Sequence, residues 1–85
     1  MEIPTDELTL AASEFDNMAN DMQLVIEHLE KVIFRLEENW HDANNQTFFQ
    51  YYDEWRRNAG SFCTLLSSTA TELKAIAENY ESASS

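Results

Sequence analysis

The chain is poor in the residues that interrupt helices. Its 85 residues include one glycine and one proline, whereas a β fold needs such residues at its many turns. Pro4 precedes the first apolar pattern, where its missing N–H does no harm. A single glycine also excludes a glycine-rich loop that could hold a phosphate. The single cysteine, Cys63, excludes an intrachain disulfide.

Positive charge is also scarce. Five Lys and Arg residues stand against sixteen Asp and Glu residues, which gives a net charge of −11. Such a surface repels phosphate groups and anionic lipids, so we expect no nucleic-acid partner. No apolar run approaches the ~18 residues of a membrane span, and no basic-then-apolar signal peptide begins the chain. We therefore expect neither membrane insertion nor a cleaved signal peptide.

Apolar residues recur in two long ladders, with steps that alternate between four and three residues. Only an α-helix brings residues at this spacing onto one stripe, and the mean period of about 3.5 is that of a coiled-coil seam. The first ladder consists of Leu8, Ala12, Phe15, Ala19, Met22, Ile26, Leu29, Ile33, Leu36 and Trp40. The second consists of Phe48, Tyr52, Trp55, Ala59, Phe62, Leu66, Thr69, Leu73, Ile76 and Tyr80.

The ladders are separated by very few residues around Asp42. Two long helices joined by so short a link must fold back antiparallel. The sequence therefore predicts an all-α fold, an antiparallel two-helix hairpin that forms a single domain over residues 1–85. We place helix one at about 6–39, the bend at about 40–42 and helix two at about 43–81. Thr5 is the expected N-cap, followed by Asp6 and Glu7 near the positive end of the helix dipole.

Each helix carries more apolar surface than a two-helix seam uses. A seam needs heptad positions a and d only, whereas a three-sevenths apolar face is typical of a helix in a larger bundle. With Ala12 and Tyr52 at position a, the g positions of helix one and the e positions of helix two are largely apolar. We predict that two hairpins dimerise into a four-helix bundle. The predicted interface comprises Ala11, Met18, Val25, Val32, Phe49 and Cys63. In the alternative, part of this stripe widens a single groove and the chain is monomeric.

Residues suited to catalysis are few. Cys63, at a helical e position, fits a small buried hydrophobe better than a nucleophile. Glu38 and His41 have the Glu-x-x-His spacing of di-iron four-helix proteins, but such sites need a second motif and further core carboxylates. The motif occurs once here, at a helix end. We expect no catalytic residue, no cofactor and no metal site, and conclude that the chain is not an enzyme.

A tryptophan lies at the bend, and aromatic residues follow it. The segment Leu36-Glu37-Glu38-Asn39-Trp40 leads into the turn, and further residues have matching positions in helix two: Ala43, Phe48, Trp55, Leu66, Leu73 and Tyr80. Over nearly its whole length the chain resembles the WXG family of small early-secreted-antigen-like (ESAT-like) substrates of bacterial type VII secretion. The resemblance implies a helical hairpin with a Trp-x-Gly motif at its bend.

Two positions depart from the family pattern. The turn glycine corresponds to Asp42, whose carboxylate can accept hydrogen bonds from the N–H groups of Asn44 or Asn45 and cap the second helix. Exported members often carry a Tyr-x-x-x-Asp/Glu signal just past the second helix. Tyr80 stands in that place, but its fourth neighbour is Ser84 rather than an acid. This departure implies that any export depends either on a signal supplied by a partner or on other residues of this chain that the motif does not identify.

The resemblance implies a non-enzymatic protein that is folded as a dimer in the cytoplasm and then secreted without a cleaved signal peptide. Its implied partners are a second copy or a sister WXG-type protein, the type VII secretion ATPase, and a larger secreted toxin. Trp40, Asp42 and Tyr80 would form the secretion or turn motif, unless Trp40 only closes the end of the bundle. The alternatives are an accessory or targeting subunit on the helical domain of a toxin, and a cytosolic helical adaptor or chaperone.

Overall fold

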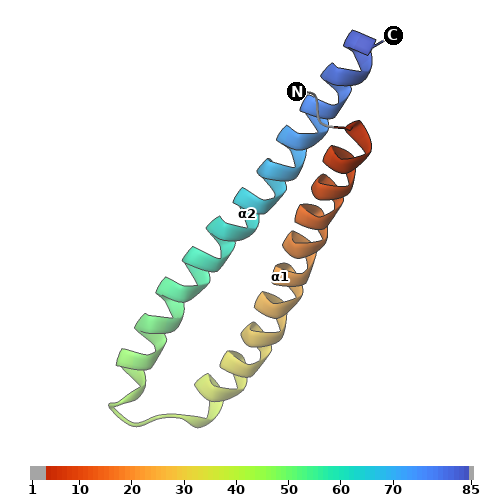
Figure 1. The fold of residues 1–85 in the computed structure, drawn as a ribbon. Coiled ribbons are helices and arrows are strands. Elements are labelled where there is room, and N and C mark those ends of the chain that lie inside the picture. The colour runs from red at the N-terminus through yellow and green to blue at the C-terminus, as the bar shows by residue number, and fades with distance from the viewer. Residues whose placement is uncertain (1–3, 85) are drawn as a thin grey trace.

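Two long helices make up the structure, a computed structural model that describes residues 4–84. Helix α1 (Thr5–Asn39) and helix α2 (Asn45–Ser84) lie side by side and antiparallel, joined by residues 40–44 (Figure 1). The predicted all-α hairpin is confirmed. The link continues to residue 44 rather than the predicted 42, because a turn precedes α2. In this turn the N–H of Asn45 donates to the carbonyl oxygen of Asp42 (3.3 Å).

The hairpin is a rod of 65 × 17 × 16 Å, with a radius of gyration of 19.2 Å. A compact globular domain of this length would have a radius of gyration of about 12 Å. Both chain ends lie at the same end of the rod, opposite the bend (Figure 1). We call this end the open end. A pair of helices has no enclosed interior, so burial is confined to the line along which they touch.

The start of α1 differs from the sequence prediction. Pro4, not Thr5, occupies the N-cap position, and no side chain caps the helix. The carbonyl oxygen of Pro4 accepts the backbone N–H groups of Glu7 (3.1 Å) and Leu8 (3.4 Å). Thr5 therefore lies within the first turn and is not the N-cap, because proline is compatible with the extended conformation there.

Helix α1 contacts its partner through the predicted a positions. Four residues of this row are 0–7% exposed: Ala12, Ala19, Ile26 and Ile33. Leu8 (8% exposed) is the buried d residue at the start of the helix, and four further d positions are only half-buried: Phe15, Met22, Leu29 and Leu36. The contact with α2 is therefore centred on the a row, and the d row lies at its edge.

Helix α2 is rotated relative to the predicted seam. Ala59 and Leu66 are buried as expected, but Ala70 (0% exposed) and Ala77 (5%), at e positions, are buried too. The predicted d residues Trp55 (38% exposed) and Phe62 (50%) lie at the exposed edge of the contact and not between the helices, so their assignment to the buried seam was wrong. Small side chains at e let the backbones approach closely, whereas large aromatic rings at d have no room between the helices.

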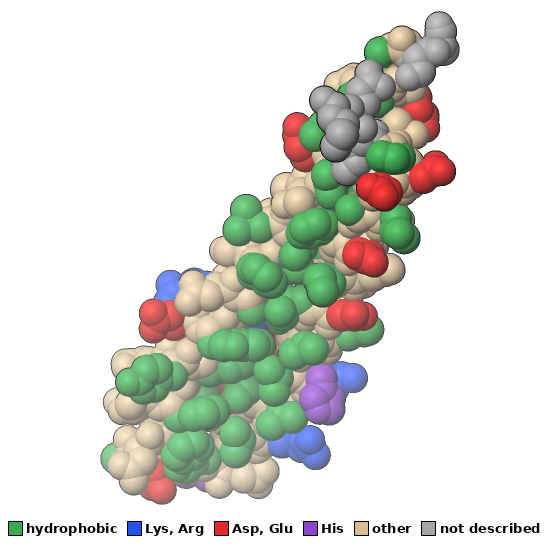
Figure 2. Space-filling view, in the orientation of Figure 1, with side chains coloured by type: hydrophobic (Ala, Val, Ile, Leu, Met, Phe, Trp, Pro, Cys, Tyr) green, Lys and Arg blue, Asp and Glu red, His purple; other side chains and the backbone are tan. Residues whose placement is uncertain are grey.

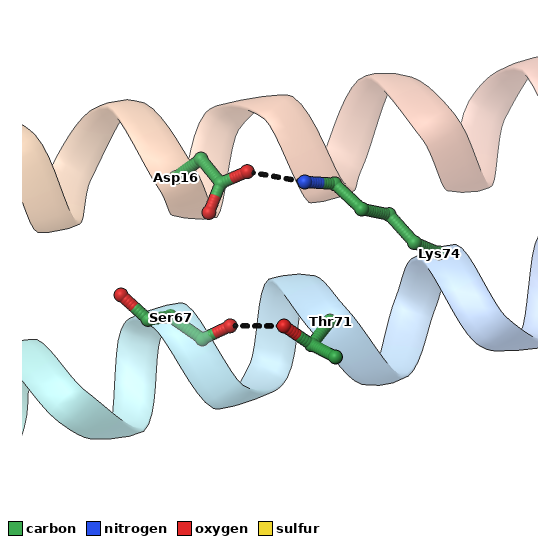
Figure 3. A network of polar contacts seen from close by, with 4 residues as sticks. All are labelled: Asp16, Ser67, Thr71 and Lys74. Carbon is green, nitrogen blue, oxygen red and sulfur yellow. Dashed lines mark hydrogen bonds and ion pairs between the residues drawn. The ribbon is translucent and has the colours of Figure 1, made fainter.

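Two ion pairs join the helices along one edge of the contact. Lys74 pairs with Asp16 across the two helices (Figure 3), with 2.6 Å between Nζ and Oδ2. Arg56 Nε lies 2.7 Å from Glu30 Oε1. All four side chains are about half exposed, so each pair contributes on the order of 0.2–1 kcal/mol. Asp16 and Glu30 are e positions of α1. The d and g positions of both helices consequently lie on the opposite side of the seam.

Candidate functional site

The bend is closed by hydrogen bonds to the backbone on either side of Trp40. The Trp40 N–H donates to the carbonyl oxygen of Leu36 (2.8 Å) and completes the last turn of α1. The Asn45 side-chain Nδ2 donates to the Trp40 carbonyl oxygen (2.8 Å). The end of α1 and the start of α2 are thus fastened to the same residue.

Asp42 occupies the centre of the bend. Its Oδ1 accepts hydrogen bonds from the backbone N–H of Asn44 (2.9 Å) and from the indole Nε1–H of Trp40 (2.9 Å). The bond to Asn44 is one that the sequence led us to expect. It makes an Asx turn just ahead of α2. The bond to the indole was not predicted, because residue spacing alone does not give the orientation of the ring.

The bend does not use glycine-like backbone geometry. Among the described residues, none has a positive φ angle. The left-handed conformation is the usual reason for a glycine in a tight turn. Asp42 therefore adopts the bend conformation without backbone strain, and its carboxylate adds contacts that a glycine lacks.

Three aromatic rings pack together beside the bend. The Trp40 ring centroid lies 5.5 Å from that of Phe48 and 5.9 Å from that of Phe49, and the two phenylalanine rings meet edge to face at 5.4 Å. These distances fall in the range at which aromatic pairs attract one another. Trp40 is half-buried, so part of its ring remains accessible to a partner.

His41 and Glu38 do not form a metal-binding pair. His41 Nε2 lies 2.7 Å from the backbone carbonyl oxygen of Glu38 and forms a hydrogen bond with it. Over residues 4–84, no group of three or more His, Cys, Asp or Glu side chains is arranged to hold a metal ion.

Tyr80 lies far from the other motif residues. It is half-buried near the C-terminal end of α2, at the open end of the rod, whereas Trp40 and Asp42 lie at the bend. The structure brings Trp40 and Asp42 together and separates both from Tyr80 by most of the length of the molecule. A single chain cannot combine them into one site.

A broad apolar face covers the side of the seam opposite the ion pairs, and Figure 2 shows it extending along both helices with acidic residues at its margin. We call this surface the outer face. On α1 it includes Met18 (59% exposed) and Val25 (49%), together with the half-buried Ala11 and Val32. On α2 it consists of the d residues Phe48 (36%), Trp55 (38%) and Phe62 (50%), with Leu65 (63%) beside them.

Two residues of the predicted interface lie elsewhere. Cys63 is half-buried against α1, with its Sγ 3.2 Å from the Ala19 carbonyl oxygen, and Phe49 packs against Trp40 at the bend. Neither lies on the outer face with Met18 and Val25, because the rotation of α2 directs its e positions toward the seam. Sequence reasoning missed Trp55 and Phe62 as outer-face residues. The small residues at Cys63, Ala70 and Ala77 were the signal that the e row packs inward.

Comparison with known proteins agrees with the geometry of the bend and the hairpin. The profile of the WXG100 family, described as "Proteins of 100 residues with WXG", matches residues 1–85. The chain belongs to the WXG100 family. Its Trp40-His41-Asp42 segment holds the motif position, with aspartate in place of glycine.

Solved structures of a secreted protein, EsxB from Bacillus anthracis str. Sterne, have the same fold. A selenomethionine-labelled form is 27% identical with a TM-score of 0.89, and the match covers 100% of this chain and 97% of that one. A wild-type form is 28% identical with a TM-score of 0.85, over 95% of this chain and 93% of that one. No curated protein sequence matches the chain.

WXG100 proteins are non-enzymatic secreted substrates, so the conclusion that this chain is not an enzyme is confirmed at the level of the family. In residues 4–84, neither helix has a stretch long and apolar enough to cross a lipid bilayer.

Proposed function

We propose that this WXG100 protein is a substrate of a bacterial type VII secretion system and leaves the cell as a folded dimer. The observation that carries the proposal is the outer face, an apolar surface on a chain that belongs to a family of secreted substrates. The similar EsxB is described as a secreted protein. The implied partners are a second copy or a sister WXG100 protein, together with the secretion ATPase.

The amount of exposed surface supports association. A globular monomer of this mass exposes about 5200 Å², whereas the chain exposes 6621 Å². The excess of about 1400 Å² exceeds the ~800 Å² that each partner buries in an interface of standard size. Two hairpins that pack outer face to outer face form a four-helix bundle with a closed apolar core.

An acidic substitution on the outer face should prevent this association. Val25→Glu places a charge in a surface that becomes buried, and we expect the dissociation constant to rise by roughly a hundredfold or more. Leu24→Glu is the matched control, because Leu24 is 63% exposed and lies on the other side of α1. Sedimentation equilibrium at micromolar concentrations measures both. A monomeric wild-type chain that binds no sister protein would exclude the dimer.

Trp40 is the residue that we assign to recognition by the secretion machinery. Trp40→Ala should leave the helix content largely intact and block export, because it removes the accessible ring at the bend. Phe34→Ala is the control, since Phe34 is an exposed aromatic residue (62%) of α1 that is not one of the three packed rings at the bend. The assay is accumulation of the protein outside cells of the native host. Export that proceeds equally well without Trp40 would contradict this assignment.

The missing tail acid favours a second candidate function within the same family. Ser84 stands where exported members often have an acid after Tyr80, so the chain would depend on a partner that supplies the signal. An accessory subunit bound to the helical domain of a larger secreted toxin meets this requirement. Co-expression distinguishes the two candidates: a substrate is exported with a WXG100 sister, whereas an accessory subunit is exported only when the toxin is present and co-purifies with it.

A further inference from the structure

All three polar groups of Trp40 are used inside the bend. Its backbone N–H donates to Leu36, its carbonyl oxygen accepts from Asn45, and its indole N–H donates to Asp42, at 2.8, 2.8 and 2.9 Å. The side chain of Trp40 therefore has no free hydrogen-bond donor to offer a partner. What remains accessible is the carbon surface of a half-buried ring.

Asp42 controls the orientation of that ring. One carboxylate oxygen, Oδ1, is shared between the indole N–H and the backbone N–H of Asn44. Hydrogen bonds to an ionised acceptor are the stronger ones in proteins. Because Asn44 is tied to the start of α2, the shared oxygen holds the indole at a fixed position relative to that helix. The rings of Phe48 and Phe49 support its apolar side.

We propose that Asp42, at the glycine position of the motif, is a positioning residue for Trp40. By binding the indole N–H, it makes the bend present the apolar surface of the ring to a partner while the N–H donor stays occupied. Such a bend fits an apolar pocket and disfavours a pocket whose specificity depends on an acceptor for the indole N–H. The existence of such a pocket in a partner rests on the proposed function. The position of the indole is a property of this chain alone.

Nuclear magnetic resonance of ¹⁵N-labelled indole groups tests the positioning directly. The chain has two tryptophans, and Trp40→Phe identifies the Trp40 signal, which leaves Trp55 as an internal reference. In Asp42→Ala, we expect the Trp40 indole proton to shift and to exchange with solvent on the order of tenfold faster, as befits the loss of a charge-assisted hydrogen bond. Asp42→Asn keeps an acceptor oxygen and should retain most of the protection.

Asp53→Ala is the matched control, because it removes an exposed acid from α2 outside the bend. It should leave the Trp40 signal unchanged, and circular dichroism should show equal helix content in all variants. An unchanged Trp40 signal in Asp42→Ala would overturn the positioning role, whatever the result of the export assay.

The export assay tests the apolar pocket. Trp40→Phe keeps an aromatic ring but has no N–H, so it should lose no more export than Asp42→Ala, and much less than Trp40→Ala. If Trp40→Phe abolishes export while Asp42→Ala, which frees the indole N–H, preserves it, the partner binds the N–H and this part of the proposal is wrong. If every variant is exported normally but the indole is released in Asp42→Ala, the positioning role stands and the proposed recognition through Trp40 fails.

Discussion

Alanine makes an unusually large part of the contact between the helices. Among residues 4–83, five of the nine buried apolar side chains are alanines: Ala12, Ala19, Ala59, Ala70 and Ala77. Each buries little more than one methyl group, and a buried methylene-sized group contributes about 0.8 kcal/mol. Ile26 is the largest fully buried side chain. Close approach of the helices thus comes with little apolar burial per residue.

Tyr52 is the residue whose polar group is least well accommodated. Its hydroxyl is shielded from solvent and has no hydrogen-bond partner among the described residues, while its ring stacks on Trp55 at 5.9 Å between centroids. Burial, and next the nearby negative charge of Glu30, raise the pKa of the Tyr52 hydroxyl above 10.0. The folded state therefore favours the neutral phenol over the phenolate.

We predict that Tyr52→Phe is neutral or stabilises the fold by up to about 1 kcal/mol, because it removes an unpaired hydroxyl and keeps the ring. The raised pKa has a consequence for pH. The stabilisation of the folded state by the protonated Tyr52 hydroxyl is complete below the unfolded-state pKa of about 10. It is lost as the pH rises through the higher folded-state pKa. Tyr52→Phe should reduce the loss of stability in strong alkali. Urea unfolding at neutral and alkaline pH measures both effects, and a clear destabilisation at neutral pH would mean that the hydroxyl has a partner.

The two ends of the helix pair are held together differently. Near the open end the seam contains Leu8 and Leu66 with the alanines Ala12, Ala19, Ala70 and Ala77, whereas nearer the bend it contains Ile26, Ile33 and Ala59. The bend itself is closed by the hydrogen bonds of Trp40, Asp42 and Asn45 and by three packed rings. Polar contacts and packed aromatic rings therefore reinforce the seam at the bend.

We predict that the open end exchanges its amide hydrogens faster than the half of the hairpin that contains the bend. Local opening requires more free energy near the bend, where the short link, its hydrogen bonds and the packed rings hold the two helices together. Hydrogen exchange compares the open-end half, residues 9–20 and 68–80, with the bend half, residues 22–36 and 48–62. The Val25→Glu variant is used so that a dimer partner does not cover either half. Equal protection along both helices would show that the contacts at the bend do not control opening.

The sequence predicts some rows of the heptad pattern correctly and others not. The period of the ladders gave two antiparallel helices, because no other structure brings such spacing onto one face. It also gave the a row of α1. The period could not give the rotation of α2, because the d row and the e row of this helix are both largely apolar. The d row contains Phe48, Trp55 and Phe62, and the e row contains Phe49, Cys63, Ala70 and Ala77. Side-chain size decided between them, and size acts through packing, which periodicity does not describe.

Charge is distributed unevenly along the whole rod. Lys31, Arg35, Arg56 and Arg57 all lie in the half that contains the bend, and only Lys74 lies in the half with the open end. Two hairpins that pack in parallel would place their most acidic halves together. Two antiparallel hairpins would place each acidic half beside the half that carries the basic residues, which is the favourable arrangement. It would also bring the Tyr80 of each chain toward the Trp40 of the other.

A row of exposed residues along the outer face of α1 has the same asymmetry. Its members recur every seven residues and change from acidic to basic: Glu7, Glu14, Asp21, His28 and Arg35. A two-fold axis at the level of Asp21, near the middle of α1, gives antiparallel hairpins their greatest overlap. It places Glu7 of one chain beside Arg35 of the other, twice per dimer. The α2 edge of this face adds two acids, Glu54 and Glu72, and no base, so favourable pairs must come from the α1 row.

This arrangement predicts that two charge reversals, each harmful alone, compensate when the variant chains are mixed. In a Glu7→Arg dimer both pairs become Arg with Arg, and in an Arg35→Glu dimer both become Glu with Glu. Each variant should self-associate about five- to thirtyfold more weakly at low salt, as expected for roughly 1–2 kcal/mol from two exposed pairs. A mixed dimer restores both pairs and should form with nearly wild-type affinity. Arg57→Glu makes the same change in charge away from the outer face and is the control. Sedimentation of the separate and mixed chains measures the effect; if mixing restores nothing, the hairpins do not pack antiparallel in this register, because only that register joins position 7 to position 35.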